Sequence, residues 1–185
     1  MKNKSTISLL MALVLGLAVN AGIVNEAAAE SIRLPLLHLR VAGGMPAPGG
    51  LASSDLMVTA DGGVMVREFY HPKDFGSGKP AEKKNYQLPN LNARVLAEVK
   101  ETVASLKGGE LVEPNQPGCM DAPRSEYSIY KNGQKTVVYM IDACRPFQLR
   151  DESQRPAANK IRELLNKLLA KAHERSSTTI DSTIN

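Results

Sequence analysis

Side chains suited to acid–base or metal chemistry are few and dispersed in this 185-residue chain. Its three histidines are His38, His71 and His173, and no two of them share a helix face or a metal-ligand spacing. The Gly76–Pro80 segment resembles a phosphate-binding loop only superficially, because Pro80 stands where that loop needs Ser or Thr. We therefore predict surface or half-buried histidines, no metal site and no cofactor.

A carboxylate pair is conceivable at the base of a hairpin, where Asp121 and Asp142 approach each other if the strands continue that far. The expected register places Asp142 opposite Pro123. Turn aspartates that form local hydrogen bonds are the more common arrangement. We expect a non-enzyme, with a hydrolase that relies on Asp121 and Asp142 as an alternative.

The two cysteines, Cys119 and Cys144, are expected to form a disulfide if the protein meets oxidising conditions. Such a bond would stabilise the fold by about 3 kcal/mol in the chain-entropy model. It would also restrict the segment 113–123, and a pre-ordered loop binds with less loss of entropy. The glycine- and proline-rich segment Gly43–Gly50 is a second constrained loop. The candidate binding residues are Gly43, Gly44, Met45, Met120, Asp121, Ala122 and Pro123. The alternative is a disulfide that only secures the fold.

The first 29 residues have the pattern of an export signal. Lysines precede the apolar run Ile7–Val19, and the small residues Ala27–Ala29 follow it. The run is shorter than the roughly 20 residues that span a bilayer. We predict cleavage before Glu30, with Ala21 as a second site, then a periplasmic or secreted protein without a stable membrane anchor. An uncleaved anchor is the alternative.

The rest of the chain suits one domain, residues 30–175, followed by a polar tail, residues 176–185, that we expect to be disordered. The formal net charge of the whole chain is +4 at pH 7, and its basic residues form no large cluster. Nucleic-acid binding needs a clustered basic face, so we do not predict it.

Hydrophobic periodicity predicts an α+β fold, namely a small antiparallel β-sheet of hairpins, two amphipathic helices packed on one face, and one disulfide. About four to six strands are expected, and residues 70–89 are expected to form a long surface loop. The predicted strands are 36–41, 56–60, 64–69, 111–112 and the two runs around Asn132-Gly133, and the predicted helices are 91–106 and 156–172.

Asn132-Gly133 is the strongest local signal, because Asn-Gly between β-rich runs is typical of a two-residue type I′ hairpin. This turn pairs Lys131 with Gln134 and fixes the register. Continued to the open end of the hairpin, the register places Cys144 about two residues from the level of Cys119. A disulfide there requires the chain to bend.

The order of these elements resembles the emfourin group, small bacterial protein inhibitors of protealysin-like, thermolysin-type metalloproteases. The resemblance rests on Gly43-Gly44, Asp121, Tyr127-Ser128-Ile129 and Ile161–Leu169, and it covers about residues 36–172. It implies a non-enzymatic protein-binding module whose partner is a protease, with a rigid loop in the active cleft and Asp121 as a candidate to approach the metal.

A structural or small-ligand-binding periplasmic protein is the alternative to a protein-binding module. It predicts an apolar pocket between the sheet and the helices. A core that is filled without a void would count against it. The side chains expected to fill that core are Val99, Val137, Tyr139, Leu165 and Leu168.

Overall fold

The computed structural model describes residues 34–44, 47–74, 82–113 and 115–181, with side chains described as far as Glu174. Internal contacts divide the chain at Arg33, and the unit that begins at Leu34 is the one described below. The predicted export signal and Met45 of the candidate binding loop lie outside the described residues. Within the described part, no helix is long and apolar enough to cross a membrane.

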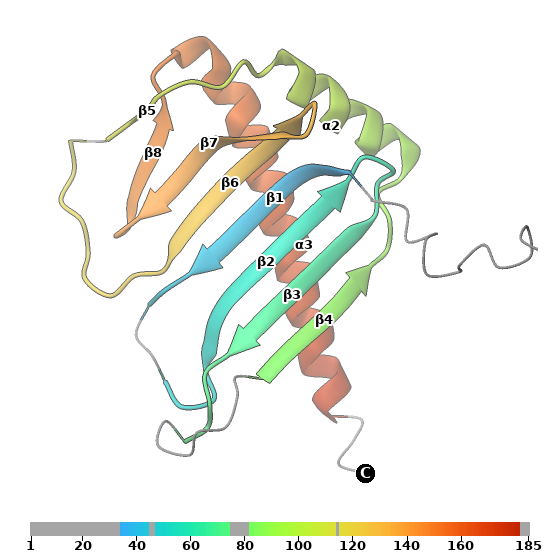
Figure 1. Ribbon diagram of the computed structural model, residues 1–185, viewed down its shortest axis with the longest axis vertical. Coiled ribbons are helices and arrows are strands. Elements are labelled where there is room, and N and C mark those ends of the chain that lie inside the picture. The colour runs from blue at the N-terminus through green and yellow to red at the C-terminus, as the bar shows by residue number, and fades with distance from the viewer. Residues whose placement is uncertain (1–33, 45–46, 75–81, 114, 182–185) are drawn as a thin grey trace, which may run out of the picture. The chain divides into compact units, whose positions relative to one another are not determined.

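One antiparallel sheet of eight strands carries the fold (Figure 1). Its order is β4-β3-β2-β1-β6-β7-β8-β5, so that β1 joins the strands that follow it directly to those from the second half of the chain. The strands are β1 (Pro35–Ala42), β2 (Leu51–Thr59), β3 (Val64–Tyr70), β4 (Glu82–Leu88), β5 (Leu111–Val112), β6 (Arg124–Lys131), β7 (Gln134–Asp142) and β8 (Arg145–Leu149).

The helices are α2 (Ala93–Ser105) and α3 (Arg155–Asp181), and a short 3-10 turn, η2 (Glu152–Gln154), leads into α3. In Figure 1, α3 runs behind the strands, and it contacts β1, β6, β7 and α2. Leu39 of β1, Tyr127 of β6 and Leu165 of α3 are buried in one apolar cluster. Alternate strand residues such as Arg40 lie on the opposite side, which we call the open face of the sheet.

The predicted antiparallel sheet, two helices and single disulfide are confirmed for the described residues, but the sheet is larger than expected. The prediction of one surface loop over residues 70–89 is wrong, because β4 lies within that segment. The glycines and prolines that flank this strand predicted a loop, although more and less exposed side chains alternate within the strand. Tyr86 pairs with Val66 and Leu88 pairs with Val64. These pairs extend the apolar face of the sheet by one strand.

The Asn132-Gly133 turn pairs Lys131 with Gln134 as predicted. The register then shifts between Tyr127 and Ser128, where β7 carries one extra residue. The bulge at Val138 leaves Val138 and Tyr139 both buried, whereas Val137 is opposite Ser128 and only half-buried. The expectation that Val137 fills the core is therefore wrong.

Both helices have a clear origin in the sequence, but α3 is longer than predicted. Asn92 caps α2, its side-chain oxygen accepting from the Val95 amide at 2.9 Å. The last turns of α3 reach Asp181, so residues 176–181 are helical and not the predicted disordered tail. Neither glycine nor proline follows Pro156, and the helix has no residue that would stop it.

A buried carboxylate connects the far part of α3 to the β3–β4 side of the sheet. Glu68 is 1% exposed and accepts hydrogen bonds from the hydroxyls of Tyr70, at 2.5 Å, and Tyr86, at 3.0 Å. His173 of α3 lies 3.3 Å from its other oxygen. A buried carboxylate needs such partners, because leaving it unpaired is costly.

Gly108 and Gly133 offer a matched test of how closely the end of α2 packs on β7. Their φ angles are +78° and +77°, but a Cβ on Gly108 would lie 2.5 Å from Thr136 Cγ2, and a Cβ on Gly133 would meet nothing within 4 Å. We expect Gly133→Ala to lower the free energy of unfolding by about 1 kcal/mol and Gly108→Ala by about 2 kcal/mol or more. Urea denaturation measures both.

A second background separates the two contributions at Gly108. Thr136→Ala removes the atom that the new Cβ would strike, so the Gly108→Ala cost in that background should fall to that of Gly133→Ala. Equal costs for the two glycine substitutions in the unmodified protein would contradict the close packing.

Candidate functional site

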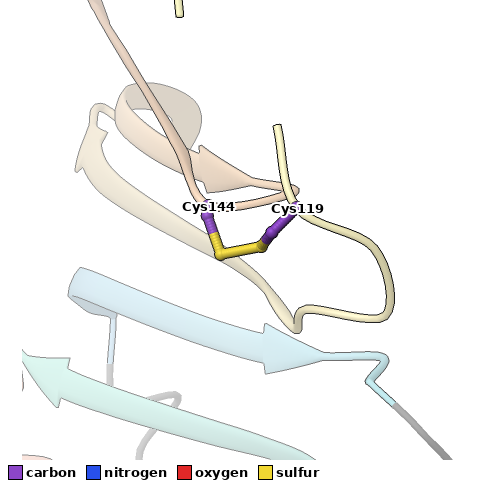
Figure 2. Close-up of a disulfide and its surroundings, with 2 residues drawn as sticks. All are labelled: Cys119 and Cys144. Atoms are coloured by element: carbon purple, nitrogen blue, oxygen red, sulfur yellow. A yellow bond between two sulfur atoms is a disulfide. The ribbon is translucent and has the colours of Figure 1, made fainter. Parts of the chain in front are cut away.

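The predicted disulfide between Cys119 and Cys144 is confirmed, and Figure 2 shows it joining the segment before β6 to the β7–β8 connection. The two Cα atoms lie 5.5 Å apart, within the ordinary range for a disulfide. Its setting differs from the one predicted. Cys144 does not extend β7 but lies in a tight turn into β8, a strand that the sequence analysis did not anticipate.

That turn consists of Ala143 and Cys144, whose φ angles are +46° and +62°. Asp142 pairs with Arg145 across it, as expected for a two-residue hairpin with two left-handed residues. Alanine tolerates that conformation poorly. The disulfide and a hydrogen bond of 2.8 Å from the Cys119 amide to the Ala143 carbonyl oxygen hold the turn in place.

The structure brings the two predicted binding loops together at one end of the sheet. Gly43-Gly44 directly follows β1 and Asp121–Pro123 directly precedes β6. Because β1 and β6 are antiparallel neighbours, with Ala42 opposite Arg124, the end of one meets the start of the other. A Cβ on Gly44 would lie 3.7 Å from the Asp121 carbonyl oxygen.

We call Gly43, Gly44 and residues 119–123, with Cys144, the stapled site. Its outer surface consists of Met120, 91% exposed, together with Asp121 and Pro123, which are also exposed. Ala122 is half-buried and anchors the segment. Asp121 has a φ of +58°, a conformation that few non-glycine residues adopt.

Arg145 secures the other side of the stapled site. Its guanidinium forms an ion pair with Glu113, at the end of β5, and lies 5.8 Å from the ring centroid of Phe147. Gly118 leaves room for this arrangement, since a Cβ there would lie 3.0 Å from the Ala143 carbonyl oxygen and 3.1 Å from Arg145 Nε. The loop is therefore held at its start by β8 as well as by the disulfide.

The prediction that Asp142 lies opposite Pro123 is wrong, because the bulge in β7 shifts the register by one residue. Ile141 pairs with Ser125, which places Asp142 at the level of Arg124. No group of three His, Cys, Asp or Glu in the described part is placed to hold a metal ion. The catalytic alternative therefore gains no geometric support from Asp121 and Asp142.

The sequence analysis missed a polar pair on the open face. His38 Nε2 lies 3.2 Å from Asp55 Oδ1, and the imidazole is half-buried. Ser128 lies opposite His38 on the adjacent strand. Both Ser128 Oγ and His38 Nδ1 are buried without a hydrogen-bond partner. The alternation of β1 placed His38 away from the core, but only the β1–β2 register brings Asp55 to it.

With this geometry established, comparison of the chain with protein-family models, curated proteins and solved structures finds no match. The resemblance to the emfourin group therefore stays a prediction. What distinguishes the stapled site physically is the combination of a covalent link, left-handed non-glycine residues and an exposed methionine.

The strain in the β7–β8 turn is testable with one substitution at two positions. Ala143→Gly should raise the free energy of unfolding by about 0.5–1 kcal/mol, because glycine adopts a positive φ without a Cβ clash. Ala122→Gly is the control, since Ala122 does not have a positive φ. Glycine at this position raises the conformational entropy of the unfolded chain without relieving strain in the folded protein. Thermal denaturation should show opposite signs; a loss of stability in both variants would contradict the assigned strain.

His38 gives the folded protein a pH dependence. Burial lowers the pKa of His38, and Asp55 on β2 and Glu126 on β6 oppose this effect while Lys135 on β7 adds to it. The unfolded chain, with an imidazole pKa of about 6.5, then binds the proton more readily than the folded protein. Stability is complete above that pH and falls as the pH decreases through the lowered pKa.

His38→Asn should therefore reduce the loss of stability between about pH 7 and pH 5. Urea midpoints at several pH values measure the difference between the two proteins. Parallel pH profiles would show that His38 does not contribute this dependence.

Proposed function

We propose that this protein is an exported, non-enzymatic binding module that presents the stapled site to another protein. Its most concrete form is inhibition of a thermolysin-type metalloprotease, as the emfourin resemblance suggests. The observation that carries the proposal is the exposed Met120-Asp121 pair on a loop that a disulfide fixes at one end and β6 fixes at the other.

Backbone strain supports a functional role for this loop. Four non-glycine residues of the described chain have positive φ. Three of them lie in two-residue hairpin turns, which require this conformation: Asn132, Ala143 and Cys144. The fourth, Asp121, lies in the loop before β6, where no such turn requires it. Strained residues persist where the surroundings hold them, and they cluster at ligand clamps and active sites.

The chemistry of the exposed pair suits the cleft of a metalloprotease. A catalytic zinc keeps an open coordination position that a carboxylate oxygen can occupy. Asp121 supplies such an oxygen, and the neighbouring Met120 supplies an unbranched apolar side chain that adapts to a hydrophobic subsite. Because the loop is held before binding, little entropy is lost when it enters the cleft.

The rest of the fold fits the same proposal. Helix α3 contacts β1, β6 and β7, while Met120, Asp121 and Pro123, just before β6, are exposed. A disulfide persists in the periplasm or outside the cell and is rare in the cytosol, which supports the predicted export.

Titration of a purified thermolysin-type protease with this protein tests the proposal. We expect protease activity to fall with increasing inhibitor and to be lost near stoichiometry. Asp121→Asn should weaken inhibition at least about ten-fold, since it removes the charge while asparagine tolerates the left-handed backbone. Met120→Ala should weaken it by a similar factor through lost apolar contact.

Leu34→Ala is the control, because Leu34 is 61% exposed and precedes β1, whose other end leads to the stapled site. It should inhibit as the unmodified protein does. Full protease activity at a molar excess of the protein would reject the inhibitor proposal. Equal effects of Met120→Ala and Leu34→Ala would show that the stapled site is not the contact surface.

A further inference from the structure

The open face of the sheet carries a groove of about 530 Å³ across β1, β2, β3 and β4. Its volume lies within the roughly 300–1,000 Å³ of small-molecule sites. The groove does not include any residue of the stapled site. Two rows of its lining residues cross the strands, one with charged residues and one with methionines.

The charged row places two arginines on either side of one aspartate. Arg67 of β3 lies opposite Asp55 of β2, and Asp55 lies opposite Arg40 of β1. Neighbouring strands are about 4.8 Å apart, so the two arginine backbones are separated by roughly 10 Å. Both arginines are exposed, and their long side chains are able to converge on one group above the sheet.

The acidic neighbours of these arginines are already engaged. Asp55 Oδ1 is 3.2 Å from His38 Nε2. Glu126, opposite Arg40 on β6, has one oxygen 2.5 Å from Lys135 Nζ. Among the described residues, no hydrogen bond or ion pair holds the guanidinium of Arg40 or Arg67. Among the residues that line the groove, two arginines accompany one aspartate, so the groove has a local excess of positive charge.

The second row gives the groove an apolar floor. Met57 of β2 lies opposite Met65 of β3, one pleat along from the charged row. Methionine side chains adapt to irregular apolar groups. At the end of this row lies His38 of β1, opposite Met57.

We infer that this groove binds a small amphipathic carboxylate, with the carboxylate group held by Arg40 and Arg67 and the hydrocarbon part lying on Met57 and Met65. Arginine suits this role because its planar fork donates two parallel hydrogen bonds to a carboxylate. A single carboxylate suits this pair better than a run of phosphates, because Arg40 and Arg67 are the only arginines or lysines among the described residues that line the groove.

Octanoate is the probe, and methionine methyl groups labelled with carbon-13 are the reporters. In the purified full chain, octanoate should shift the methyl signals of Met57 and Met65 saturably and leave Met120 of the stapled site unmoved. Octanamide has the same hydrocarbon part without the charge, and it should bind at least about ten-fold more weakly. Methionine-to-leucine variants assign the signals.

Arg40→Gln and Arg67→Gln should each raise the dissociation constant of octanoate by about ten-fold. The matched control is Arg94→Gln, which changes the charge equally on α2, where the side chain of Arg94 is 89% exposed. It should leave the constant unchanged, and thermal denaturation verifies that all three variants are folded.

Three results would overturn the inference. They are an absence of saturable shifts at Met57 and Met65, equal binding of octanoate and octanamide, and an Arg94→Gln effect as large as that of Arg67→Gln. The last two would show, respectively, that the methionines alone or the net charge of the protein alone explains the binding.

Discussion

The fold depends on the two ladders of β1. This strand pairs with β2 on one side and with β6 on the other, and it is the link between strands from the two halves of the chain. Its inward side chains Leu37 and Leu39 are 0% and 1% exposed, and they meet the apolar side of α3. Without β1 the sheet would separate into two groups of strands, and α3 would lose the central part of the surface that buries it.

The same strand also arranges both proposed binding regions. Its outward residues His38 and Arg40 contribute to the groove on the open face, and its end delivers Gly43-Gly44 to the stapled site. The two regions differ in how they are made rigid. The groove lies on strands that are paired with each other. The stapled site lies beyond the last β1–β6 pair, Ala42 with Arg124, and is held by a covalent bond instead. The two proposed sites therefore differ in construction: one is a covalently held loop and the other is a polar and apolar surface on paired strands.

Patterns within a few residues of each other were predictable from the sequence. The Asn132-Gly133 hairpin and helix α2 each follow from a local signal, and both are present. The disulfide, which joins residues 25 positions apart, was predictable because the chain has only two cysteines. Features that depend on distant pairing were not. The turn at Ala143-Cys144 contains no glycine or asparagine that would indicate it in the sequence. The disulfide stabilises a left-handed conformation that Ala and Cys do not favour. The bulge at Val138, the strand β4 and the His38–Asp55 contact likewise arise from partners elsewhere in the sheet.

The outer strand β4 has a consequence for self-association. An unpaired edge presents free N–H and C=O groups and invites another copy to add a strand. Here the ammonium groups of Lys83 and Lys84 fold back over Phe69 and Tyr70, at 5.7 and 4.6 Å from the ring centroids. Their stems cover aromatic surface while the charged heads stay next to β4. A second copy that added a strand here would pack against these charged side chains, which disfavours edge-to-edge pairing.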